Sequence, residues 1–170
     1  LSVASLAAAR GAASVTVVDP RSERLDLVQA AAGGGNTVPW PAADGVLERL
    51  ITDVMIADGA DLVVEACGTA AAARVAARLV ATGGTCVLAG TVAPVGEVTI
   101  DPEWVVRRQA SIRGVHNYRP HDLAVAVEHL ASPAGAGLAG LVGPVLWLAA
   151  IDEALAAASA GTGLRVVVAP

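Results

Sequence analysis

The feature that most constrains the fold lies in residues 60–97, where two short apolar runs flank an alanine-rich stretch. The first run leads through Leu62–Val64 to Cys67-Gly68, and the second covers Cys86–Ala89. Neither run alternates apolar with polar residues, which is typical of strands covered on both faces of a parallel sheet. The stretch between them, Ala70–Ala81, predicts a helix. The segment is therefore expected to form a strand, a helix and a second strand.

The ends of these elements indicate where a ligand would bind. Thr69 is placed to cap the helix, and Gly83 is placed to end it. Both strands end in small residues, Cys67-Gly68 and Gly90-Thr91. Because the carboxyl ends of parallel strands meet at one edge of a sheet, a flat ligand could lie against the backbone there. We expect the chemistry of the protein at this edge.

Strands alternate with helices along the rest of the chain. Strands are expected at residues 14–18, 36–40, 98–100, 110–115, 145–148 and 164–168, and helices at residues 1–10, 20–32, 42–57, 101–108, 122–131 and 151–160. The glycines at 33–35 are expected to end one helix, and residues 132–143 to form a surface connection. This alternation requires right-handed crossovers and a parallel sheet, and so predicts a doubly wound α/β fold.

Composition excludes several classes of function. The net charge of −5, with a pI of about 5.0, argues against nucleic acid or an anionic membrane as a partner. An aromatic content of 2% leaves no platform for stacking bases. All basic residues are arginines, so the chain offers no lysine base, no Schiff base and no Tyr-x-x-x-Lys pair. Small-molecule binding or catalysis remains.

The cysteines and the apolar segments favour a soluble cytoplasmic protein. Cys67 and Cys86 fall in predicted buried strands and lack metal-ligand spacing, so both are expected to be core thiols in a reducing compartment. No signal peptide opens the chain, and no apolar segment is long enough and free enough of glycine and charge to span a bilayer.

Asp19 is the first candidate for ligand binding. It ends a predicted strand before a helix, where an acidic side chain can accept hydrogen bonds from the ribose of a dinucleotide. Capping of the following helix is an equally good interpretation, and the two are compatible. Because a carboxylate repels a 2′-phosphate, Asp19 favours NAD over NADP. Arg24, one turn later, could reach the same ribose, although an exposed arginine at this spacing is usually solvated.

Arg165 and the histidines are weaker candidates from their positions alone. Arg165 opens an apolar run and could be held over a phosphate, but a surface ion pair is the simpler interpretation. His116 follows a strand at the carboxyl edge and could reach a ligand, whereas His121 and His129 are expected to face solvent. Three scattered histidines and two buried cysteines do not predict a metal site.

Five blocks of sequence together resemble the cofactor half of the zinc-type medium-chain alcohol dehydrogenases, a family with a Rossmann-like fold. The blocks are VTVVDPRSERL, GADLVVEACGT, GGTCVLAGTVAPVGEV, IRGVHNYRP and GLRVVV. The resemblance implies that Asp19 and Arg24 bind the adenosine ribose of NAD and that Arg165 touches the pyrophosphate. It also implies that the backbone of Cys67-Gly68 and of Ala89, Gly90 and Thr91 lines the nicotinamide and its ribose.

The resemblance also implies what the chain lacks. Residues 1–143 would be a partial dinucleotide-binding domain without its first strand, and residues 144–170 would return to an absent catalytic domain that holds the zinc. No catalytic residue and no metal ligand are expected in this chain, and the fragment alone is expected to be inactive. In the complete enzyme, zinc would polarise a small alcohol whose hydride passes to NAD. The segment from GTVAPVGEV to IRGVHNYRP is most similar to a subgroup associated with phosphonate catabolism.

An assembly and two alternative functions complete the expectations. Gly96–Ile100 is expected to be an edge strand, which in the resembling family pairs across a two-fold axis, so a homodimer or a dimer-based tetramer is implied. A nucleotide-binding or remnant domain without activity is one alternative. A methyltransferase-like domain is a weaker one, since the carboxyl edge with Cys67-Gly68 fits the dehydrogenase blocks better.

Overall fold

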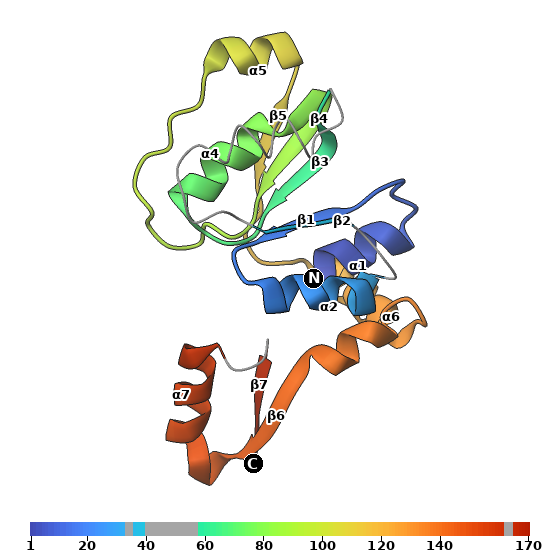
Figure 1. The fold of residues 1–170 in the computed structure, drawn as a ribbon, viewed down its shortest axis with the longest axis vertical. Coiled ribbons are helices and arrows are strands. Elements are labelled where there is room, and N and C mark those ends of the chain that lie inside the picture. Colours follow the sequence, from blue (N-terminus) through green and yellow to red (C-terminus); the bar gives the residue numbers. More distant parts are fainter. Residues whose placement is uncertain (33–35, 40–57, 162–164) are drawn as a thin grey trace. The chain divides into compact units, whose positions relative to one another are not determined.

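The computed structural model describes residues 1–32, 36–39, 58–161 and 165–170 (Figure 1). Its helices are α1 (Ser2–Ala9), α2 (Ser22–Ala32), α4 (Ala70–Arg78), α5 (Pro102–Arg108), α6 (Pro120–Ala131) and α7 (Ile151–Ala160), with the short 3-10 helices η2 (Ala136–Leu141) and η3 (Leu148–Ala150). Its strands are β1 (Thr16–Asp19), β2 (Asn36–Pro39), β3 (Ala60–Glu65), β4 (Val80–Leu88), β5 (Ser111–Gly114), β6 (Val142–Trp147) and β7 (Arg165–Ala169).

Every strand pairing in the described part of the chain is parallel. β1 pairs with β2, β4 lies between β3 and β5, and β6 pairs with β7. The chain divides into two compact units, one of residues 1–40 and 119–170 and the other of residues 41–118. Helices alternate with these parallel strands, which confirms the predicted α/β class.

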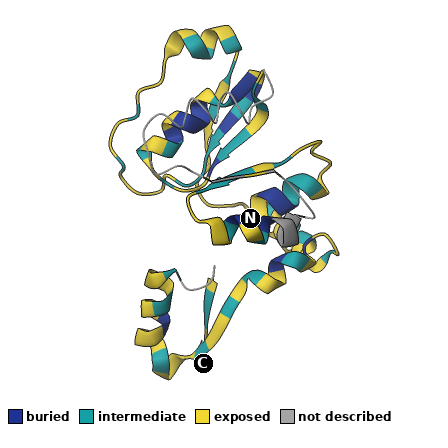
Figure 2. Cartoon of the chain, in the orientation of Figure 1, coloured by how far each residue is buried: buried dark blue, intermediate teal, exposed yellow. Residues whose placement is uncertain are grey.

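The core of the unit formed by residues 41–118 lies between α4 and the sheet β3-β4-β5. Ala76 of α4 packs with Val80 and Cys86 of β4, and these three residues are at most 5% exposed. Partly buried Trp104 and Ile112 pack against the same cluster. Figure 2 shows the buried residues gathered on α4 and β4. Burial of the apolar face of α4 against the sheet holds the carboxyl ends of β3 and β4 in place.

Helix α4 begins as predicted but ends early. Thr69 caps it, because its hydroxyl oxygen accepts a 3.2 Å hydrogen bond from the amide of Ala72. The prediction that Gly83 ends the helix is wrong, since α4 stops at Arg78 and the chain enters β4 at Val80. Gly83, with a φ of +78°, instead lies in an irregularity of β4 where the register with β3 shifts between Ala60 and Leu62.

The other unit has its core at α1, α2 and η2. Ala4 of α1, Leu25 and Val28 of α2, and Leu138 of η2 are each no more than 6% exposed. The expectation of a plain surface connection over residues 132–143 is therefore wrong in part, because η2 contributes a buried leucine to this core. An Ala- and Gly-rich sequence hides such a contribution, since one apolar residue without periodicity gives no helical signal.

Two further expectations differ from the structure or lie outside it. The predicted strand at residues 98–100 is not formed within this chain, because its backbone has no hydrogen-bonded neighbour strand in the described residues. Asp101 nevertheless caps α5 as expected, accepting the amides of Glu103 and Trp104. The expected helix at residues 42–57, the glycines at 33–35 and residue 164 of the last strand lie outside the described residues.

Candidate functional site

Asp19 lies at the end of β1 and faces two arginines. Its Oδ1 atom accepts a 2.9 Å hydrogen bond from the backbone amide of Arg21 and lies 4.0 Å from Nε of that side chain. Its Oδ2 atom lies 3.8 Å from a guanidinium nitrogen of Arg24. The cap-like role and the proximity to Arg24 are thus both present, and Arg21 places a second guanidinium beside the carboxylate.

The geometry leaves the Asp19 carboxylate available to a ligand. Both ion pairs are long, and the Asp19 side chain is 25% exposed, so solvent screens them and each contributes little to stability. A carboxylate of this kind can exchange water for hydroxyl donors without breaking a strong ion pair. The guanidinium groups of Arg21 and Arg24 stabilise the negative charge of Asp19 during such an exchange.

In the other unit, the carboxyl ends of β3 and β4 are joined by Glu65, a residue that the sequence analysis did not select. Glu65 is 3% exposed. Its Oε1 atom accepts the amides of Cys67 at 2.8 Å and Gly68 at 2.6 Å, and its Oε2 atom accepts the Thr91 hydroxyl at 2.9 Å. Its backbone carbonyl oxygen accepts the amides of Ala89 and Gly90, both at 2.9 Å. We call this set of hydrogen bonds the Glu65 clamp.

The hydrogen bonds of the clamp keep Glu65 ionised. Burial by itself would raise the pKa of this carboxyl, but the donors from Gly68, Thr91 and Cys67 outweigh it and lower the pKa below its usual value. Glu65 in turn affects a neighbour: burial, followed by the charge of Glu65, raises the pKa of the Cys86 thiol. At neutral pH the edge thus holds a buried negative charge whose lone pairs are engaged by the protein.

Two glycines bring the strand ends into close contact. A Cβ on Gly90 would lie 2.5 Å from the carbonyl carbon of Ala66 and 2.6 Å from the amide nitrogen of Cys67. Gly68 has a φ of +74°, and a Cβ there would collide with the carbonyl oxygen of Gly90. Only residues without a side chain permit this approach, so the small residues at the strand ends are explained by backbone packing as well as by access for a ligand.

The remaining predicted residues of this edge are distributed as follows. Cys67 is exposed, so the expectation that it is a core thiol is wrong: it lies past the end of β3, and its sulfur is 3.5 Å from the Thr69 hydroxyl. Cys86 is buried as predicted. The Val115 amide donates to the Leu88 carbonyl, which extends the pairing of β5 and leaves His116 exposed at the carboxyl edge.

The histidine and arginine predictions in residues 119–170 have a mixed outcome. His121 is exposed as expected, but His129 is half-buried, and its Nε2 atom lies 3.0 Å from the hydroxyl of buried Ser5. Arg165 is exposed at the start of β7, in register with Val142 of β6. The structure brings Asp19 together with Arg24, and separately brings Cys67 and Gly68 together with Ala89–Thr91.

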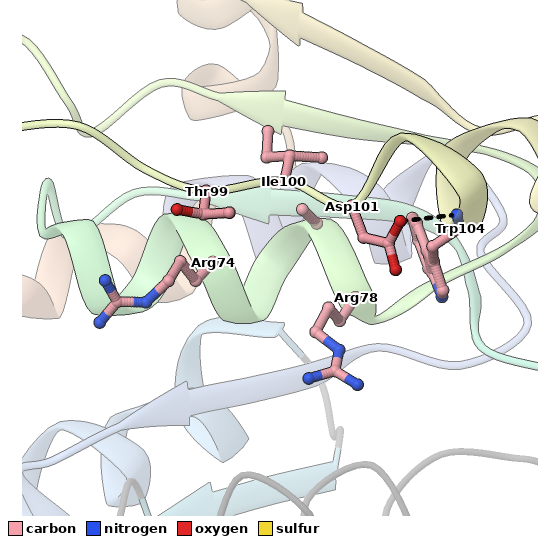
Figure 3. Close-up of a pocket in the computed structure, with 7 residues that line it drawn as sticks. Arg74, Arg78, Thr99, Ile100, Asp101 and Trp104 are labelled. Carbon is pink, nitrogen blue, oxygen red and sulfur yellow. Dashed lines mark hydrogen bonds between the residues drawn. The ribbon is translucent and has the colours of Figure 1, made fainter.

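A hollow of about 350 Å³ lies away from these residues, between α4, α5 and the segment before α5. Its lining residues are Arg74, Ala77, Arg78, Thr99, Ile100, Asp101 and Trp104. Figure 3 shows the guanidinium groups of Arg74 and Arg78 extending away from the segment that carries Thr99. Because α5 directly precedes β5, this hollow lies towards the amino end of that strand and contains none of the predicted ligand residues.

The described residues do not fit a zinc ion. Within residues 1–32, 36–39, 58–161 and 165–170, no group of three or more His, Cys, Asp or Glu side chains is arranged to hold a metal. In this part of the chain, the carboxylates of Asp19 and Glu65 are instead engaged by arginines, amides and a hydroxyl. No chemical step is therefore derived through zinc from these residues.

Comparison with known proteins decides the family. The sequence pattern described as "Zinc-binding dehydrogenase" matches residues 1–132, which is more than half of the chain. The chain belongs to the zinc-binding dehydrogenase family. This confirms the resemblance drawn from the five sequence blocks. Among curated proteins, none matches this chain.

Solved structures of several dehydrogenases share the fold of this chain. An alcohol dehydrogenase from Thermotoga maritima is 26% identical, with a TM-score of 0.87 over 98% of this chain and 46% of that one. A zinc-binding dehydrogenase from Sinorhizobium meliloti bound to NADP is 25% identical, with a TM-score of 0.79 over 98% of this chain and 48% of that one. An Escherichia coli alcohol dehydrogenase complexed with NADH is 15% identical, with a TM-score of 0.77 over 99% of this chain and 48% of that one, and shows the fold alone.

Two facts follow about extent and membrane crossing. The chain spans less than half of the length of these solved structures. Among its described helices, none combines the length and the apolar composition that a bilayer crossing requires.

Proposed function

We propose that this chain is the NAD-binding portion of a zinc-dependent alcohol dehydrogenase that oxidises a small alcohol by hydride transfer. The observation that supports it best is the carboxyl edge of β3 and β4, where an ordered turn and a glycine-lined strand end offer backbone to a flat ligand. The dehydrogenase family of the chain adds the chemistry. A phosphonate-related hydroxy compound is the proposed substrate class, from the resemblance of residues 90–120 to the subgroup associated with phosphonate catabolism.

The residues of this chain would bind and orient the cofactor. Asp19 accepts the adenosine ribose hydroxyls, with Arg24 beside it, and Arg165 contacts the pyrophosphate. The backbone of Cys67, Gly68 and Ala89–Thr91 lines the nicotinamide and its ribose, and His116 borders the same edge. When bound, NAD accepts the hydride, while the zinc and the alcohol belong to a part of the protein outside this chain.

Preference for NAD over NADP is the finer part of the proposal. The preference is supported by the charge of Asp19, because a carboxylate beside the adenosine ribose would repel a 2′-phosphate. Arg21 and Arg24 weaken that repulsion, since both lie within 4.0 Å of the carboxylate. We therefore expect a moderate preference for NAD.

Assembly through Gly96–Ile100 is the last part of the proposal. These residues carry no strand pairing inside the described chain, and the Ile100 side chain is 36% exposed. A second copy could supply the missing hydrogen-bond partner across a two-fold axis, which gives a dimer or a dimer-based tetramer.

Site-resolved alkylation of Cys67 in the complete protein tests the cofactor site. The Cys67 thiol is exposed beside the proposed nicotinamide surface, and Cys86 is a buried internal control. Saturating NAD should slow the alkylation of Cys67, and peptide mass spectrometry measures the rate. AMP, which lacks the nicotinamide half, should leave the alkylation rate of Cys67 unchanged. An unchanged Cys67 rate with saturating NAD would contradict the proposed site.

A further inference from the structure

The Glu65 carboxylate is unusual because it is a buried charge whose partners are all neutral. Glu65 is 3% exposed, and its side chain accepts hydrogen bonds from two backbone amides and one hydroxyl. Burial of a carboxylate is costly unless hydrogen bonds replace the lost water. A residue that served only to fill space between β3 and β4 would be apolar, as Val64 and Leu88 beside it are. We therefore expect the charged carboxylate to order the groups that donate hydrogen bonds to it.

The donors of the clamp belong to two separate chain segments. The amides of Cys67 and Gly68 follow β3, and the Thr91 hydroxyl follows β4, 26 residues away from Glu65 in the sequence. One side chain thus fixes the turn after β3 and the segment after β4 against each other. Gly68 and Gly90 bring the two segments into direct backbone contact, because a Cβ on either residue would collide with the other segment.

The clamp also determines which end of a dinucleotide can bind at this edge. Backbone amides that point outward from a turn bind phosphate, but here the amides of Cys67 and Gly68 already donate to Glu65. The buried negative charge adds repulsion for an anion. The nicotinamide ring, which is positively charged in NAD and neutral in NADH, and its neutral ribose face neither penalty. The edge is therefore suited to the nicotinamide riboside end of the cofactor and unsuited to the pyrophosphate.

We propose that Glu65 is a positioning residue, whose carboxylate fixes the backbone of Cys67, Gly68 and Thr91 as the surface that receives the nicotinamide ring and ribose of NAD, the part of the cofactor without a phosphate. This inference rests on the proposed cofactor function. It assigns Glu65 no contact with the cofactor: the side chain is buried, and it acts through the backbone that it orders.

Two substitutions separate geometry from charge. In Glu65→Gln, the amide oxygen can accept from Cys67 and Gly68 while the amide nitrogen donates to the Thr91 oxygen, so the clamp persists without its charge. Glu65→Ala removes the three hydrogen bonds that the Glu65 side chain accepts. Thr91→Val removes the hydroxyl, whereas Thr91→Ser retains a hydroxyl at this position. Glu103→Gln is the matched control, since Glu103 is an exposed glutamate on α5 that pairs with Arg107.

The experiment uses the complete protein and compares NAD with AMP, which carries only the adenosine half. Glu65→Ala should raise the Kd of NAD roughly tenfold and change the Kd of AMP by less than about twofold. Glu65→Gln and Thr91→Ser should retain NAD binding, and Thr91→Val should weaken it. Hydrogen exchange without ligand should show protected Cys67 and Gly68 amides in the unmutated protein and in Glu65→Gln, but not in Glu65→Ala.

The outcomes that would overturn the inference are distinct. Equal weakening of NAD and AMP by Glu65→Ala would reduce Glu65 to a general stabilising residue. Loss of NAD binding in Glu65→Gln with intact amide protection would show that the charge of Glu65, and not the backbone that it orders, determines NAD binding. If Glu65→Ala does not fold, unchanged NAD binding in Thr91→Val overturns the inference instead. Failure of the unmutated protein to bind NAD would overturn the proposed function itself. The hydrogen-exchange data on the ligand-free protein do not depend on NAD binding, so they test the ordering of the backbone by Glu65 separately.

Discussion

The Thr91 hydroxyl donates a 2.9 Å hydrogen bond to the carboxylate of Glu65 and thereby ties the segment after β4 to the end of β3. The same carboxylate orders the turn at Cys67 and Gly68. The alanine-rich helix α4 connects the two strands through the protein core. The Glu65 side chain and the packing of α4 on one face of the sheet therefore both stabilise the edge that is proposed to receive a cofactor.

Acid should weaken the fold through Glu65. Because the pKa of Glu65 is lowered in the folded protein, its ionisation stabilises the fold above the ordinary glutamate pKa of about 4.3, and that contribution is lost as the pH falls through the lower folded value. Urea unfolding of the complete protein between neutral pH and the acid range measures this loss. Glu65→Gln should remove part of the acid dependence, and Glu103→Gln should not. Parallel curves for all three proteins would contradict the role of Glu65.

A side chain at Gly90 should disrupt the edge. Gly90→Ala places a methyl group 2.5 Å from the backbone of Ala66, so the strand ends must separate, at a cost of roughly 1–3 kcal/mol in the free energy of unfolding. Gly114→Ala in β5 is the control, because a Cβ there meets nothing within 4 Å. Chemical denaturation of both variants tests this, and equal stability of the two would show that the close contact is absent in solution.

Ser5 should stabilise the packing of α1 on the end of α6. The hydroxyl proton of Ser5 goes to the Ala134 carbonyl at 3.2 Å, so His129 must donate its Nε2 proton to the Ser5 oxygen at 3.0 Å. Ser5→Ala leaves both groups without this partner and should cost about 1 kcal/mol or more. Ser14→Ala, at an exposed position, serves as the control in thermal melts. Equal melting temperatures would argue against this contact.

Sequence patterns predicted the elements well where local signals were strong. The apolar runs around Val63 and Val87, the cap at Thr69 and the Asp101-Pro102 helix start each follow from short-range physics and were confirmed. The prediction that Gly83 ends the helix was wrong because a glycine pair after a helix is also compatible with an irregular strand. The register of β4 with β3, which decides between the two, is a long-range property. Boundary errors of this kind arise when a neighbouring strand decides where pairing begins.

The candidate site was predicted less completely, for reasons that individual residues illustrate. Glu65 was not predicted as a site residue, because its burial depends on the amides of a turn and on Thr91, which lies 26 residues away in the sequence. The prediction that Cys67 is buried placed it in a buried strand, but β3 ends at Glu65 and Cys67 lies exposed past that end. His129 reaches Ser5 across 124 residues of sequence, a contact that no local pattern carries.

The edge segment Gly96–Ile100 should determine assembly. Replacement of Thr99 by Pro removes a backbone donor from the centre of the proposed intersubunit pairing and should shift the complete protein towards the monomer. Sedimentation at micromolar concentration measures the effect, with Thr99→Ser as the control. A monomeric unmutated protein under these conditions would refute the proposed pairing.

Calorimetric titration of the complete protein with NAD and with NADP tests the proposed cofactor role most directly. The account predicts that NAD binds more tightly than NADP, and that Asp19→Ala weakens NAD binding by roughly 1–3 kcal/mol because the ribose hydroxyls lose a charged acceptor. Glu23→Ala, an exposed acidic change in the first turn of the same helix, should leave the affinity for NAD unchanged. Tighter binding of NADP than of NAD, or no binding of either, would contradict it.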